Sequence, residues 1–75
     1  MNIKEFIYKL KNRLNEKLFY NVEVYRKYNK CDQTYLLRII AKRGYSKYDR
    51  KFSLHETCLD DISIQEIINV LLERW

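Results

Sequence analysis

The run QTYLLRIIAKR at positions 33–43 constrains the fold more than any other stretch of this chain. It is rich in aromatic and β-branched residues and contains neither glycine nor proline, which predicts a β-strand. Because side chains alternate across a strand, its two faces can be separated. One face is apolar and carries Tyr35, Leu37, Ile39 and Ala41. The other mixes apolar and basic side chains: Thr34, Leu36, Arg38, Ile40 and Lys42. Such a strand fits the centre of an antiparallel sheet that covers a core on one side.

Apolar residues at helical spacing predict a first helix near the start of the chain. Asn2, with Glu5 three residues later, resembles a capping box that has Asn in place of the usual Ser or Thr. The apolar residues that share one helical face are Ile3, Phe6, Ile7, Leu10 and Leu14. We expect this helix to end near Leu18, where the spacing changes, and to keep its basic face in solvent.

A second helix is predicted at the other end of the chain. Ser63 and Glu66 form a capping box, so we expect the helix to start at Ser63. Apolar residues then follow at three- and four-residue spacing: Ile64, Ile67, Ile68, Leu71, Leu72 and Trp75. We expect Trp75 to cover the core, with an exposed anchor as the alternative. Residues 56–62 are predicted to be a connection with room for one helical turn.

Two further strands are predicted on either side of the run at 33–43. Residues 19–28 alternate with a period of two, and their expected core face carries Tyr20, Val22, Val24, Arg26 and Tyr28. Polar residues at 29–32 predict a hairpin, and Gly44 is expected to supply a positive φ in the next turn. The third strand covers 45–55 and points Tyr48, Phe52 and Leu54 inward, with Arg50 at the edge of the core.

The predicted fold is therefore α+β with the order α-β-β-β-α, in which both helices pack on one face of a three-stranded antiparallel sheet. The 75 residues form a single domain, 1–75. A domain of this size buries only about 60% of its unfolded surface, so a homodimer would add stability, and monomer and homodimer both stay open. The chain contains no apolar run of about 20 residues and no signal-peptide pattern, so we expect a cytoplasmic or nucleoid-associated protein without a membrane partner. Two cysteines are too few for a disulfide scaffold.

The net charge of +5 is unevenly distributed along the chain. Residues 1–55 hold fourteen Lys or Arg against five acids, a net of +9, and residues 56–75 hold one Arg against five acids, a net of −4. A basic body with an acidic final helix suggests an anionic partner on one side. The alternative is an ordinary lysine-rich solvated surface. The abundance of Lys, Asn, Ile and Tyr fits an AT-rich genome, such as that of a low-GC bacterium or its phage.

If both helices cover one face of the sheet, the opposite face is open. The candidate binding residues on that face are Tyr25, Lys27, Leu36, Arg38, Ile40, Lys42, Tyr45 and Lys47. In one hypothesis, tyrosines stack on unpaired bases of RNA or DNA while basic side chains hold phosphates. In the other, Leu36 and Ile40 anchor a protein partner inside a polar rim. A third possibility is that dimerisation, or a helix on that side, covers the face.

No pattern in the sequence indicates an enzyme. His55 is the only histidine, and together with Cys31 and Cys58 it lacks the second half of a zinc site, so we expect no metal. Asp60 and Asp61 resemble a carboxylate pair but fit better as acids that favour a helix N-terminus. A single glycine cannot build a phosphate-binding loop, and we expect no cofactor.

The element order is similar to that of the double-stranded RNA-binding domain. That family has a lysine cluster at the start of its last helix, where this chain reads DDISIQE at positions 60–66. These acids would repel phosphates, so the family's RNA-binding residues are not carried over to this chain.

The chain also resembles the small phage-encoded anti-CRISPR and related anti-defence proteins. The shared features are the size, the Met1-Asn2-Ile3 opening into a short helix, the three-stranded meander and the terminal helix. This resemblance implies a small non-enzymatic protein of a phage or mobile element that binds and inhibits a host defence protein or ribonucleoprotein. It would bind guide RNA, an acidic effector surface or a nucleotide signal. The alternative is a basic nucleic-acid-binding protein that uses the same sheet face.

Overall fold

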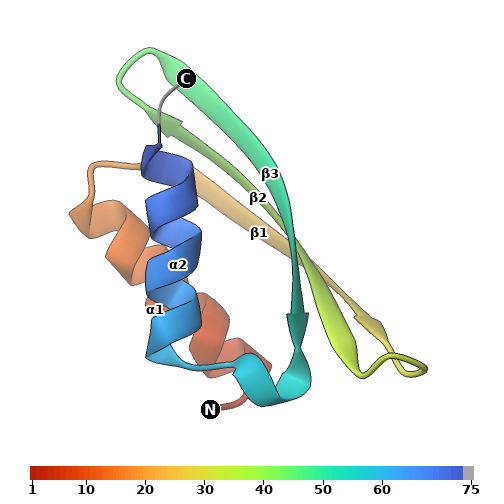
Figure 1. The fold of residues 1–75 in the computed structure, drawn as a ribbon. Coiled ribbons are helices and arrows are strands. Elements are labelled where there is room, and N and C mark those ends of the chain that lie inside the picture. The colour runs from red at the N-terminus through yellow and green to blue at the C-terminus, as the bar shows by residue number, and fades with distance from the viewer. Residues whose placement is uncertain (74–75) are drawn as a thin grey trace.

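The computed structural model describes residues 1–73, so the predicted covering role of Trp75 lies outside the described residues. The elements are α1 (Ile3–Glu16), β1 (Tyr20–Asn29), β2 (Thr34–Arg43), β3 (Ser46–His55), the short 3₁₀ helix η1 (Glu56–Cys58) and α2 (Asp61–Leu72) (Figure 1). The strands form one antiparallel sheet in the order β1-β2-β3, and both α-helices lie on the same side of it. The α+β prediction is confirmed. Within residues 1–73, no helix has the length and apolar character that crossing a membrane requires.

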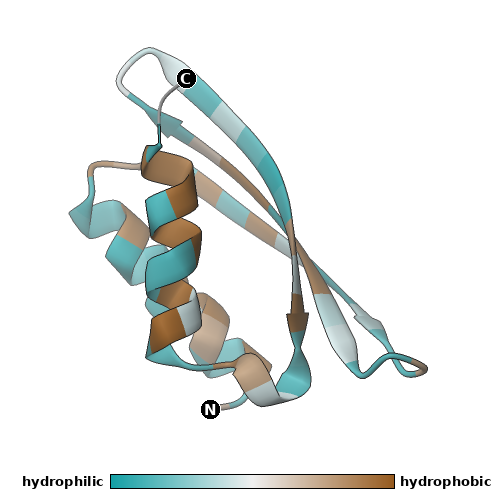
Figure 2. Cartoon of the chain, in the orientation of Figure 1, coloured by the Kyte–Doolittle hydropathy of each residue, from teal (hydrophilic) through white to brown (hydrophobic). Residues whose placement is uncertain are grey.

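The core lies between the two α-helices and one face of the sheet, which we call the inner face. Figure 2 shows hydrophobic residues on both helices and along the sheet. The buried residues include predicted core positions from three elements: Phe6, Leu10 and Leu14 from α1, Leu37, Ile39 and Ala41 from β2, and Ile64, Ile67, Ile68 and Leu71 from α2. Tyr48, Phe52 and Leu54 of β3 pack against this core as predicted, and Arg50 between them is exposed.

Helix α1 begins as predicted and ends slightly earlier than predicted. The Oδ1 atom of Asn2 accepts a hydrogen bond of 2.8 Å from the N–H of Glu5, which confirms the N-cap. The last helical residue is Glu16, because Leu18 adopts a left-handed backbone with φ of 70°. The N–H of Leu18 bonds to the carbonyl of Asn15 and the N–H of Phe19 to that of Leu14, both at 3.1 Å. These two bonds form a Schellman motif, which terminates the helix.

The predicted inward orientation of Tyr20 is wrong, because β1 starts with a bulge. Tyr20 pairs with Lys42 and Glu23 with Ile40, so β1 advances three residues where β2 advances two. Asn21 has φ of 52° at this point and absorbs the extra residue. The bulge moves Tyr20 to the face opposite the helices and moves Phe19 into the core, where only 3% of it is exposed.

The predicted start of α2 at Ser63 is also wrong. The N-cap is Asp60, whose Oδ1 accepts a hydrogen bond of 2.8 Å from the N–H of Ser63. Leu59 is buried, and the next residue, Asp60, has the extended backbone of an N-cap. The helix therefore starts at Asp61, directly after this N-cap and before Ser63. Ser63 is therefore buried inside the first turn, and Asp60 and Asp61 lie at the positive end of the helix dipole, as predicted.

Gly44 has φ of 61° in the turn between β2 and β3, which confirms the predicted role of the only glycine. An added Cβ would meet no atom within 4 Å, so only the backbone conformation favours glycine here. The Tyr20 hydroxyl donates a hydrogen bond of 2.9 Å to the Gly44 carbonyl and ties the start of β1 to this turn.

Candidate functional site

The candidate site is the face of the sheet opposite the helices, which we call the outer face. Residues that pair across antiparallel strands share a face, so the buried Leu37 and Ile39 of β2 fix which residues lie on the outer side. No described element packs on the outer face. From the β2–β3 turn toward the β1–β2 hairpin, four of its cross-strand rows are Tyr20-Lys42-Lys47, Glu23-Ile40-Asp49, Tyr25-Arg38-Lys51 and Lys27-Leu36-Ser53.

The structure brings nearly all of the predicted binding residues together on this face. Those that lie on it are Tyr25, Lys27, Leu36, Arg38, Ile40, Lys42 and Lys47. Tyr25 is 54% exposed and Leu36 is 44% exposed, whereas Ile40 is half-buried. Tyr45 does not join them, because it lies in the turn before β3, where its side chain is fully exposed. Tyr20 also belongs to the face, although the strand pattern predicts it on the inner side. Four more residues of the four cross-strand rows were not among the candidate binding residues: Glu23, Asp49, Lys51 and Ser53.

An ion pair occupies the centre of the outer face. Arg38 donates from Nε to Oδ1 of Asp49 at 3.0 Å and from Nη2 to Oδ2 at 2.8 Å. The two side chains sit diagonally across β2 and β3, because Arg38 pairs with Lys51 and Asp49 with Ile40. The hydrogen bonds from Arg38 hold the pKa of Asp49 below its ordinary value, although partial desolvation opposes this shift, and the same contact raises the pKa of Arg38. The guanidinium is therefore already occupied by a carboxylate.

Carboxylates flank Ile40 on both sides, since Glu23 pairs with it from β1 and Asp49 from β3. The Oε1 atom of Glu23 also lies 3.4 Å from the hydroxyl of Tyr25. The lysines lie in other rows, with Lys42 at one end of the face. The outer face is thus acidic beside Ile40 and basic toward its ends, a distribution that appears only once the strands are in register.

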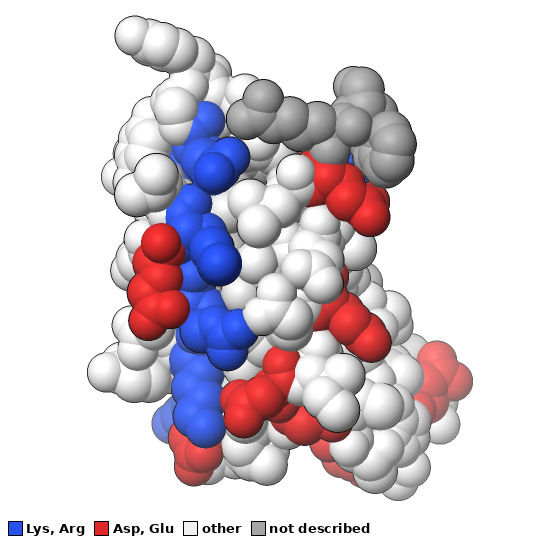
Figure 3. All heavy atoms as spheres, turned by 60° about the vertical axis from the view of Figure 1, so that its left-hand side comes forward, with Lys and Arg blue, Asp and Glu red and all other residues white. Residues whose placement is uncertain are grey.

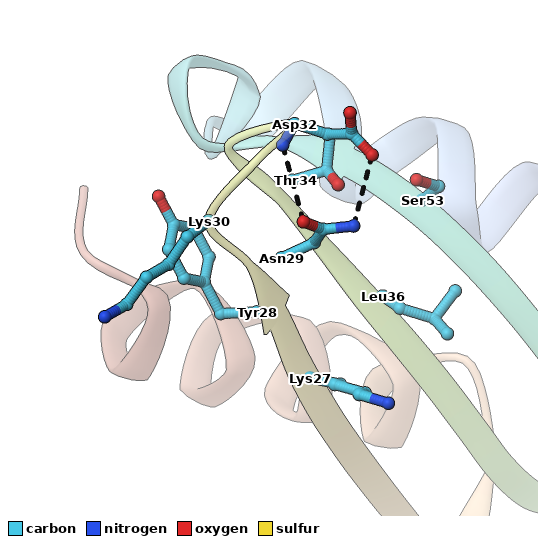
Figure 4. A pocket seen from close by; sticks show the side chains of 8 residues that line it. All are labelled: Lys27, Tyr28, Asn29, Lys30, Asp32, Thr34, Leu36 and Ser53. Carbon is cyan, nitrogen blue, oxygen red and sulfur yellow. Dashed lines mark hydrogen bonds between the residues drawn. The ribbon is translucent and has the colours of Figure 1, made fainter.

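The two aliphatic side chains on this face, Leu36 and Ile40, each line a separate hollow. The hollow near the β1–β2 hairpin has a volume of about 520 Å³ and includes Lys27, Leu36 and Ser53 in its lining. Figure 4 shows these three side chains projecting to the same side of neighbouring strands. Toward the other end, Ile40 lines a second hollow of about 440 Å³, together with Lys42. Both hollows are open to solvent and suit side chains of a larger partner better than an enclosed small molecule.

The hairpin that borders the first hollow is held by its own hydrogen bonds. Asn29 accepts a hydrogen bond from the N–H of Cys31 at 2.9 Å. It also accepts from the N–H of Asp32 at 3.4 Å and donates to the Asp32 carboxylate at 3.1 Å (Figure 4). Tyr28 points to the inner side, where its ring lies 4.8 Å from that of Tyr35. Its hydroxyl donates to Glu56 at 3.1 Å, so Tyr28 joins the hairpin to η1 and is not part of the outer face. Partial desolvation and the bond to Glu56 raise the pKa of this hydroxyl.

The basic and acidic parts of the sequence lie next to each other in the fold. Figure 3 shows a column of Lys and Arg along the helical side of the molecule, with acidic side chains on both flanks. Lys9 and Arg13 of α1 line one hollow with Asp61 of α2, and Arg13 donates a hydrogen bond to Gln65. The charge separation along the chain is therefore not a separation between two sides of the molecule, because acidic side chains lie next to the basic column on the helical side.

The histidine and the cysteines take structural or solvent-exposed positions. Nδ1 of His55 accepts a hydrogen bond of 3.2 Å from the N–H of Thr57 and caps η1. Cys31 and Cys58 are both free thiols exposed to solvent. Among residues 1–73, no three His, Cys, Asp or Glu side chains are grouped so that they could hold a metal ion.

No family model, no curated protein and no solved structure matches the chain.

Proposed function

We propose that this protein is a non-enzymatic binding protein that docks a protein partner on the outer face of its sheet. The observation that carries the proposal is the pair of aliphatic side chains, Leu36 and Ile40, on a face that no described element covers. Each lines its own hollow, and charged residues surround both. Apolar side chains inside a charged rim are the usual anatomy of a protein interface.

The charges on this face favour a protein over a nucleic acid. A phosphate backbone laid along the middle of the sheet would meet Glu23 and Asp49 beside Ile40, and Arg38 is already bound to Asp49. Phosphates repel carboxylates, whereas a protein surface can match both signs of charge within one interface. Lys27 and Lys42 would then pair with acidic residues of the partner outside the apolar contacts.

The anti-defence proteins that this chain resembles in architecture suggest what such docking does. That resemblance implies a small protein that inhibits by binding, a mode of action that needs only a complementary surface. We therefore propose a host defence protein or ribonucleoprotein as the partner, engaged through an acidic part of its protein surface.

Substitution of the two aliphatic anchors tests the proposal. Leu36→Asp and Ile40→Asp are expected to abolish partner binding while leaving the fold intact, because both side chains lie on the side of the sheet away from the core. Val70→Asp is the matched control, since Val70 is 42% exposed on α2 and the change in chemistry is the same. If the folded Leu36→Asp and Ile40→Asp proteins bound the partner as the wild-type protein does, these two side chains would not be the anchors of the interface.

A specific observation favours a second candidate function, direct nucleic-acid binding. Tyr25 is 54% exposed beside Arg38, Lys51 lies in the same cross-strand row, and Lys27 lies in the next row. Fluorescence anisotropy with single-stranded RNA, hairpin RNA and duplex DNA across a salt series distinguishes the two. Affinity that falls with a log–log slope of about −0.7 to −0.9 per phosphate contact supports this alternative. Loss of that affinity in a triple substitution of Tyr25, Arg38 and Lys42 would locate the site on the outer face.

A further inference from the structure

Strand β1 lies at one margin of the sheet, and no described strand pairs with its free edge (Figure 1). Because β2 pairs with one side of this ten-residue strand, the backbone N–H and C=O groups that point to the other side form a row along the free edge. The residues from Glu23 to Asn29 are in regular register with β2, so this part of the edge is straight enough to accept another strand. The charges on the edge then decide which strand it accepts.

The charge pattern of β1 is complementary to itself. When two copies of β1 pair antiparallel about a two-fold axis at one residue, each residue before the axis faces the residue at the same distance after the axis in the other copy. With the axis at Tyr25, the tyrosines of the two copies face each other. Glu23 of each copy then faces Lys27 of the other, and both pairs lie on the outer face. Opposite charges directly across an antiparallel pair stabilise it, as do paired aromatic rings.

Neighbouring registers lack these pairs. With the axis at Val24, Glu23 faces Tyr25, and with the axis at Arg26 the two arginines face each other and Lys27 faces Tyr25. The edge therefore selects one register against its neighbours.

The other free edge, β3, is less suited to self-pairing. With the axis at Arg50, Asp49 would face Lys51, but Arg50 would face its own copy. The Asp49 carboxylate is also already bound by Arg38. Like charges directly opposite each other destabilise a strand pair, so β1 is the better edge.

We propose that the protein forms a two-fold homodimer through the β1 edge, with Tyr25 at the axis and Glu23–Lys27 pairs on each side. The two three-stranded sheets then become one antiparallel sheet, and the two outer faces become continuous. On the inner side, Lys4, Lys11 and Arg26 line a hollow beside the same edge, and these cations repel their copies. Association is therefore weak and depends on concentration.

Charge reversal tests this dimer. Sedimentation velocity across a concentration series should show the wild-type protein passing from monomer to dimer. Glu23→Lys or Lys27→Glu alone places like charges in both pairs and should weaken association on the order of tenfold. The double variant Glu23→Lys/Lys27→Glu restores both pairs with reversed polarity and should return the wild-type affinity. Both side chains are exposed, so the variants are expected to fold.

Two controls complete the experiment. Lys51→Glu makes the same charge change as Lys27→Glu on the other edge of the sheet and should leave dimerisation unchanged. Hydrogen exchange of the β1 amides should slow as protein concentration rises. The proposal is overturned by a protein that stays monomeric up to millimolar concentration, by single variants that associate like wild type, or by a double variant as weak as the single variants. Outer-face docking does not depend on this dimer and is tested by substitutions at other residues.

Discussion

Replacing Leu18 with glycine is expected to stabilise this protein. Leu18 follows the end of α1 with φ of 70°, and 73% of its surface is exposed. The Schellman motif needs a left-handed residue at this position, and glycine is the residue that adopts it without a steric clash from Cβ. The hydrogen bonds from Leu18 and Phe19 to carbonyls of α1 come from backbone N–H groups, so glycine preserves both.

The size of the effect follows from two opposing terms. A left-handed conformation costs an L-residue roughly 1–2 kcal/mol. Glycine loses roughly 0.5–1 kcal/mol more conformational entropy on folding, and little buried surface is lost because the leucine is mostly exposed. The net gain in the free energy of unfolding is on the order of 0.5–1 kcal/mol. For a domain of this size, such a gain raises the Tm by about 2–8 °C.

Urea and thermal unfolding followed by far-ultraviolet circular dichroism measure this change. Leu18→Ala is the control for losing the side chain, since alanine keeps the Cβ and the strain, and it should not stabilise. Gly44→Ala is the reverse test. Its φ is 61° and the added Cβ has open space, so the substitution introduces backbone strain alone. It should lower the free energy of unfolding by about 1 kcal/mol. If Gly44→Ala destabilises as expected but Leu18→Gly does not raise the Tm, the strain assigned to Leu18 is refuted.

Asp60→Ala removes the N-cap of α2 and should lower the free energy of unfolding by about 1 kcal/mol, as measured by urea unfolding. Ser63→Ala should have a much smaller effect. If Ser63→Ala instead destabilised the protein more than Asp60→Ala, Ser63 would be the N-cap. Ile39→Ala, at a fully buried position of β2, should lower the free energy of unfolding by about 2–5 kcal/mol, as measured by calorimetry. A loss below about 1 kcal/mol would contradict the burial of Ile39 in the core. Arg38 lowers the folded-state pKa of Asp49, so the stability from this contact is present above the unfolded-chain value of 3.8 and is lost as pH falls through the folded pKa. Asp49→Asn should remove this part of the dependence of the free energy of unfolding on pH. A variant with the same pH dependence as the wild-type protein would contradict the ion pair.

Much of the candidate site could be predicted from the sequence, because strand periodicity is local. The alternation at 33–43 was sufficient to place Leu36, Arg38, Ile40 and Lys42 on one face, and Ala41 on the other. The arrangement across strands could not be predicted, because it depends on register between segments that are distant in the chain. The Arg38–Asp49 contact and the carboxylates beside Ile40 are consequences of that register.

The two wrong predictions in the fold have a common cause. Tyr20 and Ser63 were both assigned by extending a local pattern to the end of its element. At the ends of an element, tertiary contacts determine which residues face the core. Phe19 packs in the core beside Tyr48, with ring centroids 5.4 Å apart, and this contact shifts the start of β1 by one residue. A bulge-tolerant residue, Asn21, was the only local signal of that shift.

The sequence by itself determined the two α-helices and three strands, their order and, apart from the start of β1, their faces, because helical and strand periodicities and the Asn2 cap depend only on neighbouring residues. The tertiary structure alone decided which charges meet. It brought the acidic α2 beside the basic α1, so the separation of charge along the chain disappeared in space. Among residues 1–73, no element covers the outer face or the β1 edge. Packing joins residues that no local pattern relates, because burial of apolar surface acts on the whole chain at once.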